Sequence, residues 1–158
     1  MQNQNEWIRK LGEQVEILVA EPMKNHTTFR IGGPADALAL PKTPEEVAEV
    51  VRFCHEHAQP YYVLGNGSNL LVSDEGYRGI VLQLYRNFND IQVNGEMITV
   101  QSGAMLAAVA RTAYQNGLTG LEFASGIPGT IGGAVVMNAG AYGGEMKHVL
   151  REVTVLTK

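Results

Sequence analysis

Glycine is concentrated in one segment of this 158-residue chain: nine of its eighteen glycines lie between Gly117 and Gly144. Ordering glycine costs more backbone entropy than ordering any other residue, so such a density needs a structural reason. The usual reason is that the backbone passes very close to another backbone or to a bound ligand. Side chains from Ser125 to Gly144 are mostly small or apolar, with Asn138 and Tyr142 as the main polar groups. The segment is therefore typical of a surface that wraps a large, partly apolar ligand with main-chain donors.

Composition limits the class of protein. Hydrophobic residues make up 45% and charged residues 18%, as in globular proteins. No apolar run approaches the roughly 20 residues of a membrane span, and the polar N-terminus predicts no signal peptide. A net charge of −4 without a basic cluster argues against nucleic acid or a membrane as partner. Cys54 is the single cysteine, which excludes disulfides and cysteine metal sites and favours the cytoplasm.

Local patterns predict most of the helices and strands. Helices are expected over 5–15, from Pro44 onward with Thr43 as N-cap and Glu46 completing a capping box, and over 104–115. Strands are expected over 37–40, 61–64 and 79–84, as a hairpin over 91–102 around Asn94-Gly95, and over 152–158. The strand, helix and strand from 37 to 64 form a βαβ unit with parallel strands.

These elements fall into two lobes behind an N-terminal helix and arm, residues 1–22. The first lobe, 23–85, holds the βαβ unit, and the second, 86–158, is mixed. A domain rarely ends on an apolar strand without later structure to cover it. We therefore expect the second lobe to be truncated and the chain to be the N-terminal portion of a longer protein. The alternative is a compact domain whose last strand inserts centrally.

A second motif, Gly65-Asn66-Gly67-Ser68-Asn69-Leu70, follows the strand expected at 61–64. Ligands of α/β sheets bind at the carboxyl ends of parallel strands. Successive N–H groups in such a loop can form an anion nest that suits a diphosphate. The alternative is a type I′ hairpin turn at Asn66-Gly67. The motif matches neither a P-loop nor a complete Rossmann fingerprint.

The glycine-rich segment favours the ligand interpretation. Residues 128–134 are expected to start a helix whose first-turn N–H groups are free for phosphate, and 138–142 form a second close approach of backbone. Tight packing without a ligand is the alternative. Two separated glycine-rich loops that both lack charged side chains indicate a bound dinucleotide.

Other reactive side chains are expected to have ordinary roles. His55 and His57 point in different directions from one helix, so no metal site is expected there. His26 and His148 are isolated in loops and are expected to be solvated. Cys54 occupies the apolar face of its helix and belongs to the core.

Four stretches closely resemble the UDP-N-acetylenolpyruvoylglucosamine reductase (MurB) family. They are HTTFRIGGPA at 26–35, VLGNGSNLL at 63–71, GIPGTIGGA at 126–134 and NAGAYG at 138–143. The resemblance implies an α+β, two-lobed FAD-binding fold of the vanillyl-alcohol-oxidase/PCMH type, with an N-terminal βαβ lobe and a second mixed lobe. It also implies FAD as cofactor, NADPH as reductant and a cytoplasmic role in peptidoglycan precursor synthesis.

The resemblance further implies which residues hold FAD. The loop at 65–70 would cradle the diphosphate, and the block at 126–142 would lie along the diphosphate, ribityl chain and isoalloxazine. The implied cofactor-binding residues are Gly65, Asn66, Gly67, Ser68, Asn69, Leu70, Gly126, Ile127, Pro128, Gly129, Thr130, Gly132, Gly133, Asn138, Gly140, Ala141 and Tyr142.

No residue of this chain is expected to be catalytic. In the family the flavin takes hydride from NADPH and delivers it to the enolpyruvyl group of the UDP-sugar, while a serine donates a proton and an arginine and a glutamate handle the substrate carboxylate. The motifs that carry these residues, and the substrate-binding domain, are expected beyond Lys158. The chain alone would bind FAD without turnover. The alternatives are the FAD-binding half of another PCMH-type flavin oxidase or a stand-alone flavin-binding module.

Overall fold

The computed structural model describes residues 2–157, with side chains from Trp7 onward. The chain divides into two compact units, the first ending at Asn87 and the second beginning at Phe88. Each unit is described by itself.

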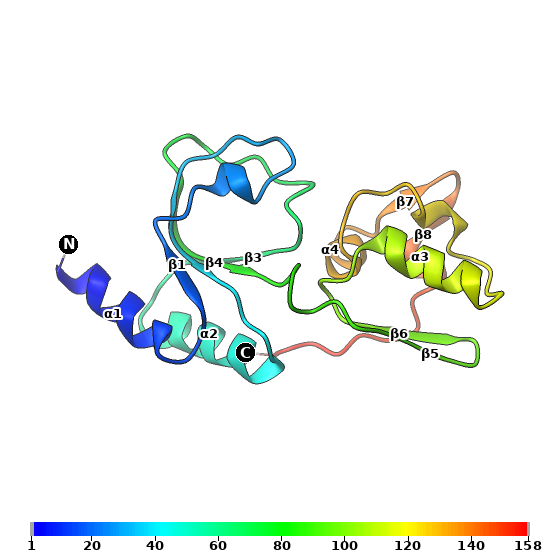
Figure 1. Ribbon diagram of the computed structural model, residues 1–158, viewed down its shortest axis with the longest axis horizontal. Coiled ribbons are helices and arrows are strands. Elements are labelled where there is room, and N and C mark those ends of the chain that lie inside the picture. Colours follow the sequence, from blue (N-terminus) through cyan, green and yellow to red (C-terminus); the bar gives the residue numbers. More distant parts are fainter. Residues whose placement is uncertain (1, 158) are drawn as a thin grey trace. The chain divides into compact units, whose positions relative to one another are not determined.

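The first unit is built on a four-stranded sheet with the order β1-β2-β4-β3 (Figure 1). Its strands are β1 (Ile17–Val19), β2 (Ala35–Ala39), β3 (Tyr61–Leu64) and β4 (Tyr77–Gln83). Strands β2, β4 and β3 are parallel, and β1 pairs antiparallel with β2. The parallel βαβ unit is confirmed, with β4 lying between its two strands. The short strand β1 is not among the predicted elements.

Two helices, α1 (Gln2–Gly12) and α2 (Pro44–Glu56), pack on one face of this sheet. The α2 helix begins as predicted, because Thr43 Oγ1 accepts the N–H of Glu46 over 3.2 Å and Pro44 takes the first position. The Glu46 carboxylate accepts the N–H of Lys42 (2.8 Å), so the expected capping box closes one residue earlier. Cys54 is buried among the apolar residues of this face, as expected.

The opposite face of the sheet is covered by irregular backbone and the short helix η1 (Met23–Asn25). Its buried core contains Met23, Leu38, Leu64 and Val81. Leu70 and Val72, from the segment between β3 and β4, pack against this core. The loop after β3 is thereby anchored to the sheet by its apolar end.

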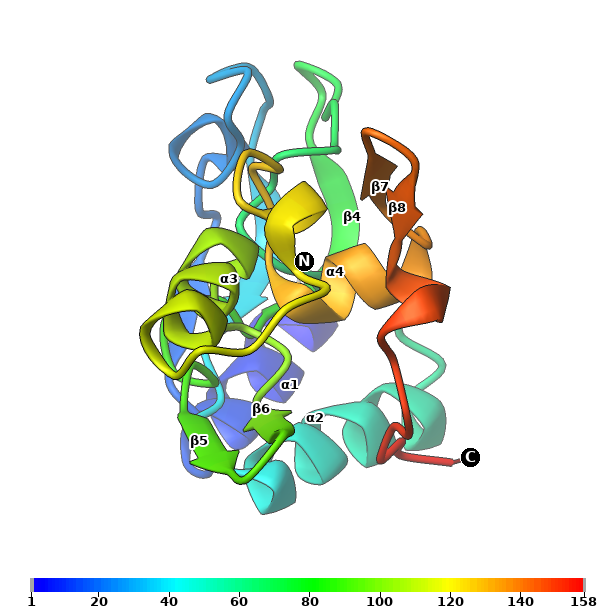
Figure 2. The ribbon, with the colours of Figure 1, turned by 90° about the vertical axis from the view of Figure 1, so that its right-hand side faces the viewer.

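The second unit begins with the hairpin of β5 (Ile91–Asn94) and β6 (Met97–Val100) (Figure 2). Since Asn94 pairs with Met97, the turn residues are Gly95 and Glu96, one position later than the Asn-Gly pair suggests. Further along lie α3 (Leu106–Gln115), η2 (Glu122–Ala124), α4 (Ile131–Val136), β7 (Gly140–Ala141), β8 (Gly144–Glu145) and η3 (Met146–His148). Side chains of α3, η2, α4 and η3 form its core.

The final predicted strand is wrong for the part that the structure describes. Residues 151–157 adopt no strand, and Val153, Val155 and Leu156 are exposed; Lys158 lies outside the described residues. A strand exists only when a neighbouring backbone satisfies its N–H and C=O groups. Within residues 2–157, no strand pairs with this segment.

Candidate functional site

The loop at 65–70 directly follows β3, at the carboxyl end of that parallel strand. Two of its carbonyl groups are held in place: Gln83 Nε2 donates to Gly65 O over 3.3 Å, and Thr28 N donates to Gly67 O over 3.1 Å. Within residues 2–157, in contrast, the N–H groups from Asn66 to Asn69 have no hydrogen-bond acceptor. Consecutive unpaired donors in an anchored loop are the arrangement that binds an anion. The hairpin alternative is excluded because β3 and β4 run parallel.

Gly67 is required by the fold itself. Its φ of +70° lies in the left-handed region. A β-carbon at Gly67 would overlap the carbonyl oxygen of His26 and would lie 2.9 Å from the α-carbon of Thr27. At this glycine the close neighbour is therefore another stretch of backbone.

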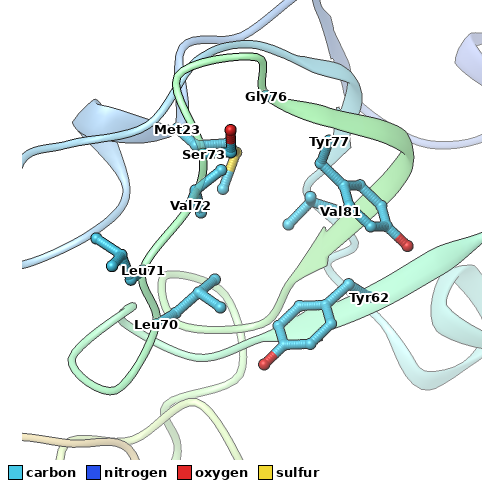
Figure 3. A pocket seen from close by; sticks show the side chains of 9 residues that line it. All are labelled: Met23, Tyr62, Leu70, Leu71, Val72, Ser73, Gly76, Tyr77 and Val81. Carbon is cyan, nitrogen blue, oxygen red and sulfur yellow. The ribbon is translucent and has the colours of Figure 1, made fainter.

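A cavity of about 270 Å³ opens beside the loop, on the sheet face opposite α1 and α2 (Figure 3). Leu70 lines it together with Tyr62 from β3 and Tyr77 from β4, whose rings meet edge to face with centroids 6.5 Å apart. Burial raises the pKa of Tyr77. The lining of the cavity is mostly apolar.

The amides at the start of α4 are not free, contrary to the prediction. Ile131 N donates to Ala104 O and Gly132 N to Ser102 O, each over 2.8 Å, while Gly133 N donates to Thr130 Oγ1 over 3.4 Å. A β-carbon at Gly132 would lie 2.8 Å from that of Ser102. Gly132 thus allows two backbone segments to approach, and its N–H group is used in that contact.

Other glycines of the segment face open space. Apart from Gly126 itself and its two neighbours in the chain, no atom of the described residues lies within 4 Å of a β-carbon added to Gly126. At Gly133 the nearest atom is Thr130 Oγ1 at 3.5 Å, an ordinary contact. At these two positions the packing of the chain does not require glycine, which leaves room for something else to approach.

The two polar side chains of the segment have different surroundings. Asn138 Nδ2 donates to Glu145 Oε2 over 2.6 Å and its Oδ1 accepts the N–H of Lys147 over 3.0 Å, so its amide stabilises the chain. The ring of Tyr142 is fully exposed, and its φ is +52°. Tyr142 and Gly143 (φ +84°) form the turn between β7 and β8. A non-glycine residue held in this conformation is a feature often seen at functional sites.

Among residues 2–157 there is no group of three or more His, Cys, Asp or Glu side chains that could hold a metal ion. Burial raises the pKa of Cys54 to about 11, so its thiol is not a nucleophile near neutral pH. Ser125 Oγ donates to Glu122 O over 2.9 Å. Among the helices in the described part of the chain, none has the length and apolar character to cross a membrane.

His26 is not solvated, contrary to the prediction. Its side chain is 8% exposed, with Nε2 at 2.9 Å from Glu21 Oε1 and Nδ1 at 3.0 Å from Gln83 Oε1. Gln83, which also holds Gly65, and the ring-bearing Tyr62 and Tyr77 are missing from the predicted site. The one signal in the sequence that could have found them is their position within the strands on either side of the loop, β3 and β4.

Comparison with known proteins defines the class. Residues 35–158 match the FAD binding domain family, and the chain belongs to that family. It is similar to UDP-N-acetylenolpyruvoylglucosamine reductases: 54% identical over 142 residues to that of Exiguobacterium sibiricum and 48% over 151 residues to that of Alkaliphilus metalliredigens. These alignments cover 90% and 96% of this chain but 46% and 49% of the relatives, so the chain spans about half their length.

Solved structures agree. The crystal structure of the reductase (MurB) from Thermus caldophilus superposes with a TM-score of 0.68 at 41% identity, covering 84% of this chain and 45% of that protein. Cholesterol oxidase from Brevibacterium sterolicum (TM-score 0.62, 19% identity, 81% of this chain and 25% of that one) shares the fold alone. The predicted α+β FAD-binding fold and the resemblance to the MurB family are confirmed, and FAD is the cofactor of this class.

Proposed function

We propose that the loop at 65–70 binds the diphosphate of FAD through its main chain. The observation that carries this proposal is the asymmetry of the loop: its carbonyl groups at Gly65 and Gly67 are anchored, while the N–H groups from Asn66 to Asn69 have no acceptor within residues 2–157. A diphosphate would satisfy these donors without a basic side chain. Ser68 and Asn69 add polar side chains to the same loop.

We propose that the glycine-rich segment of the second unit, taken by itself, also contacts FAD. Gly126 and Gly133 leave open space where a flat ligand can approach the backbone. The exposed ring of Tyr142 offers an aromatic surface. The remaining proposed contacts are Gly65, Leu70, Ile127, Pro128, Gly129, Thr130, Gly132, Asn138, Gly140 and Ala141, with the N–H groups of Gly132 and Gly133 used within the fold.

The proposed activity of the whole protein follows from the relatives. Their name, UDP-N-acetylenolpyruvoylglucosamine reductase, specifies reduction of an enolpyruvyl UDP-sugar, and bound FAD supplies the hydride chemistry. NADPH as reductant, the cytoplasm as location and peptidoglycan precursor synthesis as pathway belong to the same proposal. The residues of this chain bind and orient the flavin. Binding of the UDP-sugar and proton donation are proposed to need sequence from the half of the relatives that this chain does not span.

Calorimetric titration of the 158-residue chain with FAD, ADP and adenosine tests the proposal. If the loop recognises the diphosphate, FAD and ADP bind, and adenosine binds at least about tenfold more weakly, a difference of 1.4 kcal/mol. Equal affinities for ADP and adenosine would show that the loop does not recognise the diphosphate. Absence of FAD binding would contradict the proposed function as a whole.

A further inference from the structure

A buried glutamine, Gln83, lies at the end of strand β4 in a position that faces the apolar core. Val81, two positions earlier, belongs to the core on the face of the sheet opposite α1 and α2, and side chains two positions apart in a strand share a face. Gln83 is only 3% exposed. Burying an amide is unfavourable unless its polar atoms find hydrogen-bond partners. The partners of this amide therefore show what the residue does.

One end of the Gln83 amide reaches the proposed diphosphate loop. Its Nε2 donates to the carbonyl oxygen of Gly65, the first residue of the loop, over 3.3 Å. The Gly65 carbonyl can only accept, so the nitrogen of the amide must face it. The Oε1 of Gln83 lies 3.0 Å from His26 Nδ1. Both polar atoms of the buried amide are thus in contact with a partner, and one partner is the backbone of the loop.

A carbonyl group that is held in place also fixes the direction of the N–H group that follows it. In a trans peptide unit the C=O of one residue and the N–H of the next point in opposite directions, and the peptide units of residues 2–157 are all trans. The Gly65 carbonyl points toward Gln83. The N–H of Asn66 must therefore point away from Gln83 and out of the core of the sheet.

The second carbonyl anchor of the loop has the same effect two residues later. The Gly67 carbonyl accepts the N–H of Thr28 over 3.1 Å, so the N–H of Ser68 points away from the segment at 26–28. Neither the Asn66 nor the Ser68 N–H group has an acceptor within residues 2–157. The two anchors thus each direct one of the free donors of the loop.

We propose that Gln83 is a positioning residue of the proposed diphosphate loop: by holding the Gly65 carbonyl, its amide keeps the Asn66 N–H directed toward the diphosphate. This inference rests on the proposed function of the loop. The bond from Gln83 is a bond of the chain to itself, so the direction of the Asn66 N–H is set without a ligand. A donor that is already oriented lowers the entropy cost of binding.

Relaxation of 15N in the chain without ligand tests the positioning by itself. In the parent chain we expect the Asn66 and Ser68 amides to be as rigid as the strands, with order parameters of about 0.85. Gln83→Met removes the amide and keeps an unbranched side chain. It should lower the Asn66 value below about 0.6, while Ser68, which Thr28 holds, changes less. Gln83→Glu is the second variant, because it keeps the shape and, as a carboxylate, has no donor for Gly65.

The inference is overturned if the Asn66 amide is already flexible in the parent chain. It is equally overturned if Asn66 stays as rigid in the folded Gln83 variants as in the parent chain. Neither outcome depends on FAD binding.

Calorimetric titration with FAD tests what the positioning contributes to binding. Gln83→Met should weaken FAD about tenfold, the effect of one misdirected hydrogen-bond donor. Gln59→Met is the matched control, since Gln59 Nε2 also donates to a backbone carbonyl, that of His57, over 3.2 Å; it should leave the affinity unchanged. Ile80→Val opens a small cavity on the opposite face of the same strand and should lower stability without weakening FAD.

Parent-like FAD affinity in Gln83→Met overturns the role of Gln83 in binding. An equal loss of affinity in Ile80→Val also overturns it, because the effect would then follow stability alone. If FAD and ADP do not bind to the parent chain, the proposed function fails, while the relaxation measurement still decides whether Gln83 orients the Asn66 amide.

Discussion

The N–H group of Thr28 donates to the carbonyl oxygen of Gly67 over 3.1 Å, although the two residues are 39 positions apart in the chain. This bond brings the backbone of His26 so close that a β-carbon at Gly67 would overlap its carbonyl oxygen. The segment at 26–28 therefore contacts the loop proposed to hold the diphosphate and fixes the position of its backbone at Gly67. Glycine is needed at position 67 for this contact, whether or not a ligand is bound.

Gly67→Ala should accordingly lower the free energy of unfolding by about 2–4 kcal/mol, because a left-handed φ is strained for alanine and the backbone at His26 must also move. Gly95→Ala is the matched control, since Gly95 has φ +59° but, apart from its chain neighbours, no described atom lies within 4 Å of an added β-carbon. It should lose only about 1–2 kcal/mol. Urea unfolding compares the two variants. Equal losses would show that the approach of His26 contributes nothing.

Gly133→Ala tests the ligand surface without disturbing the fold. The added methyl group meets only Thr130 Oγ1, at 3.5 Å, and alanine favours a helix by about 0.8–1 kcal/mol over glycine. Stability should be unchanged or higher, while FAD affinity falls at least about tenfold if the methyl group occupies space that we propose for FAD. Gly12→Ala, which is equally open and lies outside both loops, is the control for calorimetry. Normal FAD binding by Gly133→Ala would exclude α4 from the site.

Tyr142→Asn separates backbone strain from ligand contact. Asparagine tolerates the left-handed conformation better than tyrosine, so stability should rise by up to about 1 kcal/mol. Loss of the exposed ring should weaken FAD by about threefold to tenfold, the effect of losing one aromatic contact. Tyr114→Asn makes the same chemical change at another exposed tyrosine, on α3, and should leave FAD binding unchanged. If both variants bind FAD as the parent chain does, Tyr142 has no part in the site.

Acid should weaken the fold through Glu21. The hydrogen bond from His26, followed by that from Asn25, lowers the pKa of Glu21 below its ordinary value of 4.5. The unfolded chain therefore binds a proton more readily than the fold, so this stabilisation is complete above pH 4.5 and is lost as the pH falls through the lowered value. Urea unfolding at a series of pH values should show a smaller acid dependence for Glu21→Gln than for the parent chain. Identical slopes would contradict the assignment.

Elements whose formation depends on residues close together in the sequence were predictable. The start of α2 is an example, because its N-cap, first-turn proline and apolar spacing all lie within one short segment. Strand β1 was not predictable, since three residues become a strand only by pairing with β2. The same limit explains the last predicted strand, whose alternating apolar residues find no partner strand within residues 2–157.

The candidate site shows the same division. The density of glycines predicted that the backbone of this segment comes close to other atoms. The sequence did not predict which glycines contact another part of the chain and which face open space. Gly132 meets Ser102, whereas Gly126 meets nothing within 4 Å. The carbonyl groups that accept hydrogen bonds from the first N–H groups of α4 belong to the segment before α3. His26 was expected in solvent because its partner Gln83 lies 57 residues away in the chain.

The visible absorption spectrum of the purified 158-residue chain tests the central claim most directly. The sample is incubated with FAD and freed of unbound flavin, and its intact mass confirms the full chain. We predict flavin bands that remain with the protein, because the anchored loop presents its free amides to the diphosphate. A colourless protein after the same treatment would contradict the proposal that these residues form a flavin site.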